Sequence, residues 1–294
     1  MKTMMKIQAA AGMYRVISTA RKLVGAGDSV RVVRKGLRWE LDLSEGIDLA
    51  IFVFGQFENA TAKVLERLVR PGAIVLDIGA NIGAHTLPLA RSVGSNGKVY
   101  AFEPTEYAFG KLKRNLAQNP DLAARVVAEQ VRLTSPEAHH SGEIYASWKV
   151  IGHEARHSKH LGIAKSTEGA RITTLDQHWE SLGAKRIDLI KLDVDGFEPE
   201  VIRGGKSTLR RWQPSICLEL SPHVLEERGS SLTELFDLLC ECGYKLVDLR
   251  NKSSITDSAG RLKTRIPDGA GINVLAVADQ PADWQQAPEN KSAA

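Results

Sequence analysis

One short stretch decides the fold of this chain: Ile74-Val75-Leu76-Asp77-Ile78-Gly79-Ala80-Asn81-Ile82-Gly83. The apolar run from Ile74 to Ile78 is typical of a buried strand, and the two glycines that follow bracket a tight turn. Residues 84–91 are compatible with a helix that carries Pro88 in its first turns. A strand, a glycine turn and a helix in this order bring backbone N–H groups to one point, which favours the polar or negatively charged head of a nucleotide-like ligand.

A second strand with an acid at its end strengthens this interpretation. The spacing D-x-G-x-N-x-G differs from the G-x-G-x-x-G of nicotinamide cofactor sites. Roughly twenty residues further on, the run 99–102 predicts a strand that ends at Glu103. A carboxylate at that place can accept hydrogen bonds from both hydroxyls of a ribose.

Composition describes an ordinary globular protein. The 294 residues are 43% hydrophobic and 25% charged, and a formal charge of +4 is too small to argue for a nucleic-acid partner. No apolar run has the length of a transmembrane helix. Cys217 lies in a strand pattern and Cys240 in a helical one, so both are predicted to be buried thiols in a reducing, cytoplasmic location. Cys240 and Cys242 stand too close together for a zinc site.

Residues 1–45 are predicted to form an N-terminal basic helix and short strands. No acid occurs between positions 1 and 27, whereas five basic residues do: Lys2, Lys6, Arg15, Arg21 and Lys22. Apolar residues fall near one helical stripe: Ile7, Ala10, Ala11, Tyr14, Ile17 and Val24. Such a helix can lie on an anionic membrane or act as a targeting peptide. We favour a helix packed on the main domain and leave peripheral membrane contact open. Alternation from Arg31 to Leu43 predicts one or two strands around Gly36.

Residues 46–280 are predicted to form the main domain, followed by a flexible tail over 281–294. Three phenylalanines, at positions 52, 54 and 57, flank Gly55 and are candidates for a pocket wall, although core packing is favoured for at least two of them. A helix over 107–118 and a third strand over 126–133 follow. The polar segment 134–171 is predicted to be an insertion or cover. It holds five of the eight histidines: His139, His140, His153, His157 and His160. Because no suitable carboxylate or cysteine accompanies them, we predict a solvated loop and no metal site.

A second informative stretch runs over residues 187–196, where a hydrophobic strand is interrupted by charges. Alternation would place Lys191, Asp193 and Asp195 on one face, at the carboxyl end where doubly wound sheets bind ligands. Buried charges at such a place usually mark a salt-bridge network or a site. A single helix over 197–211 and a strand over 214–220 that carries Glu219 are predicted next. Residues 231–242 predict a capped helix, and the strands over 244–249 and 271–278 an antiparallel pair.

These motifs together resemble the FkbM family of methyltransferases. The resemblance rests on the glycine turn, on Phe102-Glu103-Pro104, on Thr173-Thr174-Leu175-Asp176 and on the run from Ile190 to Glu198, and it covers roughly residues 44–278. It implies a class I fold: an α/β, doubly wound, mostly parallel seven-stranded sheet with an antiparallel C-terminal strand pair. It also implies S-adenosyl-L-methionine as the cofactor. The cofactor-binding residues so implied are Asp77, Gly79, Asn81, Gly83, Glu103 and Asp193. The chain departs from the family pattern at residues 132–135 (Arg-Leu-Thr-Ser), and its cover segment is longer and more basic than usual.

The resemblance further implies an S-adenosylmethionine-dependent O-methyltransferase that acts on a hydroxyl of a sugar, glycolipid or natural product. A neutral hydroxyl is a poor nucleophile, so a base is expected. The candidates are Asp193, Asp195, Glu219 and His85. We choose Asp195, because Asp193 is also explained as the ion-pair partner of Lys191. Asp195 and Glu219 could instead hold a divalent cation, but metal-free base catalysis is favoured.

Two alternatives remain open from the sequence. The same fold could serve as a non-catalytic ligand-binding or membrane-associated protein, or as a methyltransferase for another class of acceptor. A small-molecule or glycan acceptor is the expected partner, and nucleic acid is not.

Overall fold

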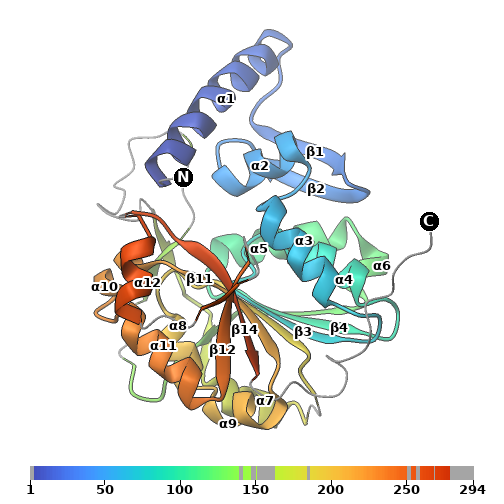
Figure 1. The fold of residues 1–294 in the computed structure, drawn as a ribbon. Coiled ribbons are helices and arrows are strands. Elements are labelled where there is room, and N and C mark those ends of the chain that lie inside the picture. The colour runs from blue at the N-terminus through green and yellow to red at the C-terminus, as the bar shows by residue number, and fades with distance from the viewer. Residues whose placement is uncertain are drawn as a thin grey trace, which may run out of the picture.

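The computed structural model describes residues 3–138, 142–146, 150, 163–183, 186–249, 253–255, 259–267 and 269–278. Its centre is an eight-stranded sheet in the order β13-β12-β14-β11-β10-β3-β4-β5 (Figure 1). In chain order these strands are β3 (Ile74–Ile78), β4 (Lys98–Phe102), β5 (Val126–Glu129), β10 (Leu189–Leu192), β11 (Ser215–Leu220), β12 (Tyr244–Asp248), β13 (Ser254–Ile255) and β14 (Ile272–Ala278).

The sheet confirms the predicted fold class. Strands β11, β10, β3, β4 and β5 pair in parallel, while β14 runs antiparallel to both β11 and β12. The sheet has eight strands rather than the predicted seven, because the two-residue strand β13 adds to the edge beside β12. The order reverses at β3, so the carboxyl ends of β3, β4 and β10 meet where this class of fold binds its ligands.

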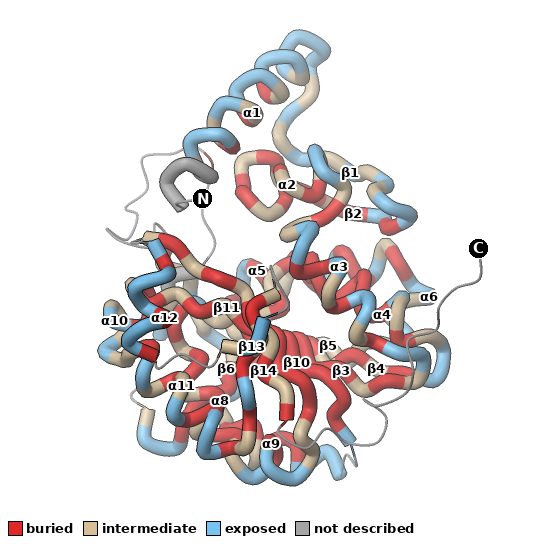
Figure 2. Tube along the Cα trace, viewed as in Figure 1, coloured by how far each residue is buried: buried red, intermediate tan, exposed pale blue. Residues whose placement is uncertain are grey.

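Helices cover both faces of the sheet. One face carries α7 (Leu175–Ser181), α8 (Glu198–Arg203), α9 (Lys206–Trp212), α11 (Leu232–Glu241) and α12 (Ala259–Arg265), with α10 (Pro222–Glu227) against α11. The other face carries α3 (Asn59–Leu68), α4 (Thr86–Ser92), α5 (Glu106–Ala117) and α6 (Pro120–Ala123). Both faces of the central strands are therefore buried, as the near-continuous red of the sheet shows (Figure 2).

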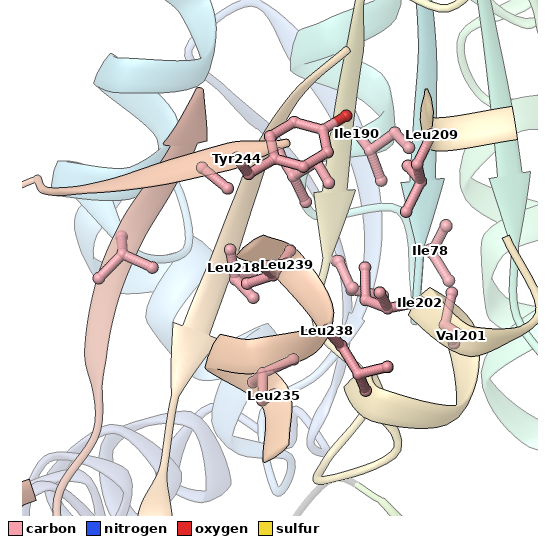
Figure 3. Close-up of a cluster of buried hydrophobic side chains, with 14 of the residues drawn as sticks. Ile78, Ile190, Val201, Ile202, Leu209, Leu218, Leu235, Leu238, Leu239 and Tyr244 are labelled. Atoms are coloured by element: carbon pink, nitrogen blue, oxygen red, sulfur yellow. The ribbon is translucent and has the colours of Figure 1, made fainter. Parts of the chain in front are cut away.

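The largest core cluster lies between the sheet and the first group of helices. Leucine and isoleucine side chains from α8, α9 and α11 pack on Ile190 and Leu218, with Tyr244 at one end (Figure 3). As predicted, Ser231 caps α11, its hydroxyl accepting a hydrogen bond from the Glu234 N–H at 3.1 Å.

Two predicted elements are each divided in the structure. The strand expected over 126–133 breaks at Gln130 into β5 and β6 (Val131–Leu133), and β6 leaves the main sheet to pair with β9 (Arg171–Thr173). The helix expected over 197–211 breaks at Gly204 and Gly205 into α8 and α9. A Cβ atom at Gly204 would lie 2.0 Å from the Thr134 carbonyl oxygen. This close approach of the end of β6 explains why residue 204 is a glycine.

An N-terminal unit extends from the main body. It consists of α1 (Thr3–Leu23), the antiparallel strands β1 (Ser29–Arg34) and β2 (Leu37–Asp42) around Gly36, and α2 (Gly46–Phe54). Ala10 and Tyr14 of α1 are buried against Leu49 of α2, whereas Val24, expected on the same stripe, lies beyond the helix and is exposed. Helix α1 thus packs on the rest of the chain, as favoured above.

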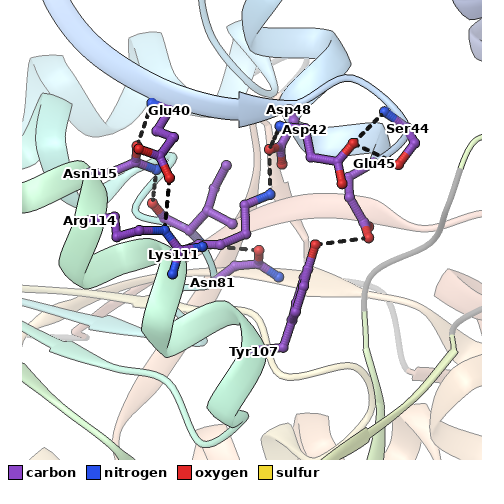
Figure 4. Close-up of polar contacts among 11 residues, drawn as sticks. Glu40, Asp42, Ser44, Glu45, Asp48, Asn81, Tyr107, Lys111, Arg114 and Asn115 are labelled. Carbon is purple, nitrogen blue, oxygen red and sulfur yellow. Dashed lines mark hydrogen bonds and ion pairs between the residues drawn. The ribbon is translucent and has the colours of Figure 1, made fainter. Parts of the chain in front are cut away.

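Buried polar contacts attach this unit to α5 (Figure 4). Lys111 contacts the Asp48 carboxylate, and both side chains are almost fully buried. The side chain of Asn115 accepts a hydrogen bond from the Glu40 N–H at 2.8 Å and donates one to the Ile82 carbonyl at 3.0 Å. One α5 side chain therefore joins β2 to the glycine turn.

The remaining predictions from the sequence concern the histidine-rich segment, the C-terminal tail, the cysteines and membrane-spanning helices. The five clustered histidines and the tail over 281–294 lie outside the described residues. Within the predicted insertion, strands β7 (Glu143–Ala146) and β8 (Ile163–Ser166) pair antiparallel. Cys217 is buried as predicted, but Cys240 is exposed and Cys242 is buried instead. None of the helices in the described part of the chain has the length and apolar character that crossing a membrane requires.

Candidate active site

The polar residues singled out from the sequence meet at the carboxyl edge of the sheet. A cavity of about 560 Å³ lies there and is lined by Glu103, Asp193, Asp195 and Glu219, and by His85. This volume is within the range of pockets that hold small molecules and cofactors. Gly79 and Asn81 line the same cavity, whereas Asp77 and Gly83 lie behind its wall.

The glycine turn requires left-handed backbone at three positions. The φ angles are +79° at Gly79, +49° at Asn81 and +91° at Gly83. The N–H groups of Gly79 and Ala80 both donate to the Phe102 carbonyl oxygen, at 2.9 and 3.0 Å. The turn is thereby fixed to the end of β4, and residues 79–81 are held along the cavity wall.

Steric contacts explain both glycines of the turn. At Gly79 a Cβ atom would lie 1.8 Å from the Asp193 carbonyl oxygen. At Gly83 it would lie 2.8 Å from a methyl group of Leu112 on α5. Both glycines allow close packing of neighbouring elements, so a Gly79→Val variant is expected to disturb the fold as well as the site.

Glu103 is buried and already holds three hydrogen bonds. Its Oε1 accepts from the Thr105 N–H at 2.9 Å and the Thr105 hydroxyl at 2.6 Å, and its Oε2 accepts from the Asn81 N–H at 2.9 Å. Burial raises the pKa of the Glu103 carboxyl, and these donors oppose the rise. A carboxylate has about four acceptor positions, so one remains, on Oε2. Glu103 therefore has room for one ribose hydroxyl rather than two.

A buried lysine organises the charges at the end of β10. The Lys191 ammonium lies 3.3 Å from Asp77 Oδ1 and 3.6 Å from Asp193 Oδ2, and it donates to the Gly79 carbonyl at 2.7 Å. Burial alone would lower the pKa of Lys191, but the two carboxylates outweigh it and the pKa is raised. Asp77 is completely buried, and its Oδ2 accepts from the Thr86 hydroxyl at 2.6 Å. Asp77 thus fixes Lys191 and α4 rather than reaching the cavity.

Asp195 stands exposed on the cavity wall. Strand β10 ends at Leu192, so the alternation expected to align Asp195 with Lys191 and Asp193 does not reach it. Its backbone instead has a φ of +50°, which is unusual for a residue with a side chain. The protein that surrounds this part of the cavity, together with the negative charges of Asp193 and Glu198, raises the pKa of the Asp195 carboxyl to about 7.

The other two candidate bases also line the cavity. Glu219 lies near the end of β11, opposite Asn273 of β14. A Cβ atom at Gly271 would be only 2.1 Å from Glu219 Oε1, so this glycine makes room for the carboxylate. His85 is buried, and burial together with the positive charge of Lys191 lowers its pKa to about 4. At neutral pH His85 is therefore neutral and a weaker base than Asp195.

The N-terminal unit forms the apolar wall of the cavity. Ala9, Ala10 and Met13 of α1 line it, and so do apolar residues of α2. Phe54 and Phe57 also line the cavity, whereas Phe52 packs beneath the Arg34 guanidinium. Phe52 and Phe57 also pack against buried core clusters, so core packing holds for two of the three phenylalanines, as expected.

Sequence reasoning missed two features of the site. Lys191 was assigned to Asp193 alone, although Asp77 is nearer to it and fully buried. The second missed feature is the contact between Asp48 and Lys111, which attaches the N-terminal unit to α5. The available signal was a single acid within the apolar run of residues 46–54, since a charge in such a run needs a partner.

No group of three or more histidine, cysteine, aspartate or glutamate side chains is arranged to hold a metal ion among the residues that the structure describes. The three imidazoles at positions 153, 157 and 160 are not among those residues.

The comparisons with known proteins match the part of the chain that forms this site. Positions 77–246 match the model of the methyltransferase FkbM domain. The 2-O-methyltransferase NoeI of Sinorhizobium fredii is 29% identical over 184 residues, which cover 60% of this chain and 75% of the relative. The hexuronic acid methyltransferase AglP of Haloferax volcanii is 30% identical over 156 residues, 52% of this chain and 58% of that protein. Among solved structures, an S-adenosylmethionine-dependent O-methyltransferase from Thermotoga maritima aligns over 89% of this chain and 82% of its own, with 15% identity and a TM-score of 0.42.

Proposed function

The chain belongs to the FkbM methyltransferase family and is an S-adenosylmethionine-dependent methyltransferase, and from this premise we propose that it methylates a hydroxyl of a sugar or natural-product acceptor. One observation carries the proposal: Asp195, a carboxylate whose pKa is raised to about 7, lines the same cavity as the buried Glu103. A base and a ribose-binding acid in one cavity suit transfer to a hydroxyl.

The residues present fit the cofactor. Glu103 Oε2 keeps one acceptor position for a ribose hydroxyl, and the ring nitrogen Nε2 of the buried His85 has no hydrogen-bond partner among the described residues. We propose that Gly79, Asn81, Glu103 and Asp193 contact the cofactor. Asp77 and Gly83 would act from behind the wall, Asp77 by holding Lys191 and Gly83 by seating the turn on α5.

The bound cofactor supplies a methyl group on a sulfonium, whose thioether leaves neutral and needs no acid. The protein has to hold the acceptor oxygen in line, which can contribute about 7–11 kcal/mol. It also has to remove the hydroxyl proton, and we assign this step to a carboxylate oxygen of Asp195. Glu219 is the second candidate, because it also lines the cavity, near the carboxyl end of β11.

The class of acceptor is supported by relatives rather than by contacts. One relative is named a 2-O-methyltransferase and another a hexuronic acid methyltransferase. We therefore expect a hydroxylated, sugar-like acceptor. The modest charge of +4 gives no support for a nucleic acid.

A labelled-transfer experiment tests this function. Purified protein with S-adenosylmethionine carrying a deuterated methyl group is offered monosaccharides, glycolipids and macrolide-type compounds, and products are analysed by mass spectrometry. We expect a labelled methyl ether and full activity in the presence of a chelator. Label on a nitrogen or carbon atom of the product instead of an oxygen would contradict the proposal, as would tight cofactor binding without transfer to any acceptor. Loss of activity with the chelator would overturn metal-free catalysis.

Replacing Glu103 with glutamine is expected to weaken binding of S-adenosylhomocysteine by roughly ten- to a hundredfold. The variant loses the ribose hydrogen bond to a charged acceptor, which contributes about 1.5–3 kcal/mol, and its NH2 group cannot accept from Asn81 or Thr105, so urea unfolding has to show that the variant keeps its fold. Isothermal titration measures the change, and Glu106→Gln, an exposed position at the start of α5, is the matched control. Equal affinity of the Glu103 variant and the wild type would mean that this carboxylate does not contact the ribose.

A further inference from the structure

Helix α1 carries a second apolar stripe besides the one that packs on α2. At 100° per residue, Ala9, Met13, Val16, Ala20 and Leu23 fall on one side of the helix, away from the buried Ala10 and Tyr14. The first two of these residues line the cavity, and the last three are exposed. The stripe therefore runs continuously from the cavity wall to the free end of α1.

Exposed apolar side chains concentrate on the same unit. Nine large apolar residues are exposed in the part of the chain that the structure describes, and six of them lie between positions 16 and 54: Val16, Leu23, Val24, Val33, Val53 and Phe54. Val16 is 72% and Leu23 83% exposed, and Phe54 is 53% exposed although it also lines the cavity. Exposed apolar side chains thus occur at the cavity, where Phe54 lies, and along α1, which projects from the body of the protein (Figure 1).

The charge of this helix is of one sign. No acid occurs before Asp28, while the exposed Arg15 and Lys22 lie together on one side of the apolar stripe, about 80–100° around the helix from Leu23, and Lys2 and Lys6 precede the stripe in sequence. An apolar stripe bordered by basic residues is the composition of helices that lie in the interface of an anionic bilayer. Basic side chains add attraction to anionic headgroups, and their long stems can follow the apolar surface.

We propose that α1 docks on an anionic bilayer through this stripe, with the mouth of the cavity facing the lipid. On the premise of the function proposed above, the hydroxyl acceptor then enters from the bilayer and is carried on a lipid anchor. Its apolar part would lie along Met13, Val16 and Phe54. The cytoplasmic location that we predict from the cysteines agrees with this, because the cytoplasmic leaflet carries the anionic lipids.

Vesicle flotation of the full-length protein tests the docking without any need for activity. Vesicles of phosphatidylcholine alone are compared with vesicles that also contain phosphatidylglycerol. We expect the wild type to float with the anionic vesicles and not with the neutral ones. The double variant Val16→Asp/Leu23→Asp and the double variant Arg15→Glu/Lys22→Glu should each partition at least about tenfold less.

Leu182→Asp is the matched control, because it also places a charge at an exposed leucine, but after α7 at the opposite end of the molecule (Figure 1). It should float like the wild type, and all variants should bind S-adenosylhomocysteine like the wild type, which shows that they fold. Equal partition of the wild type onto both kinds of vesicle would overturn the proposal. Equal partition of the wild type and all variants onto the anionic vesicles would also overturn it. Absence of flotation would also overturn it, and concentration-dependent self-association in sedimentation would then assign the stripe to a second copy of the chain. The labelled-transfer experiment uses soluble acceptors and no vesicles, so its outcome does not depend on whether the protein floats with vesicles.

Discussion

Replacing Asp195 with asparagine is expected to lower turnover by about 100- to 10,000-fold, which is the usual contribution of a general base. The amide keeps the shape of the acid but cannot accept the hydroxyl proton. Because Asp195 is exposed on the cavity wall, the substitution leaves no buried partner unsatisfied. We therefore expect the affinity for S-adenosylhomocysteine to stay at the wild-type value and the free energy of unfolding not to fall, since the raised pKa means that the folded protein disfavours the charge that the substitution removes.

The dependence on pH follows from the raised pKa. A base works in its deprotonated form, so kcat/KM should rise as pH increases through about 7 and level off above it. The Asn variant should lose this rise. Asp237→Asn, which removes an exposed carboxylate on α11, is the control for the loss of one negative charge. Wild-type turnover in the Asp195 variant would transfer the role to Glu219, which the corresponding Gln variant would then test.

Replacing Lys191 with methionine is expected to destabilise the protein by about 3–5 kcal/mol, because the variant leaves Asp77 charged and completely buried without its cation. It also removes the hydrogen bond to the Gly79 carbonyl. Urea unfolding followed by fluorescence measures the change. Cofactor binding should fall as well, since Lys191 joins the glycine turn to Asp193.

A second substitution separates this charge effect from simple loss of packing. In the double variant Asp77→Asn/Lys191→Met the buried charge is absent, so most of the lost stability should return. A loss of about 1 kcal/mol or less in the free energy of unfolding of the single variant is typical of breaking an exposed ion pair. Such a small loss would contradict the role of Lys191 as the cation that compensates the buried Asp77. No recovery in the double variant would contradict the role given to Asp77.

Local patterns were sufficient to predict the elements that hold the site. The apolar run of β3, the glycine turn and the acid after β4 are all encoded in short stretches, and the structure brings Gly79, Asn81 and Glu103 to one cavity as expected. Similarly, Asp193 and Asp195 reach the same edge because a parallel sheet aligns the carboxyl ends of its strands.

What the sequence could not show depends on contacts between distant residues. Lys191 lies between Asp77 and Asp193 only because β3 and β10 are neighbours, and sequence spacing does not reveal which of the two acids is buried. The requirement for glycine at position 204, between α8 and α9, comes from the passage of Thr134 beside it. Likewise, α1 reaches the cavity wall through its packing on α2, which a helical stripe alone does not specify.

The most direct test of the account is the titration of S-adenosylhomocysteine into two variants, Glu103→Gln and Asp195→Asn, beside the wild type. The titration requires no knowledge of the acceptor. It tests whether Glu103 binds the cofactor and whether Asp195 is a base that does not contribute to cofactor binding. We expect one bound ligand per wild-type chain, an affinity at least about tenfold lower for Glu103→Gln, and an unchanged affinity for Asp195→Asn. An unchanged Glu103 variant together with a weakened Asp195 variant would contradict this expectation.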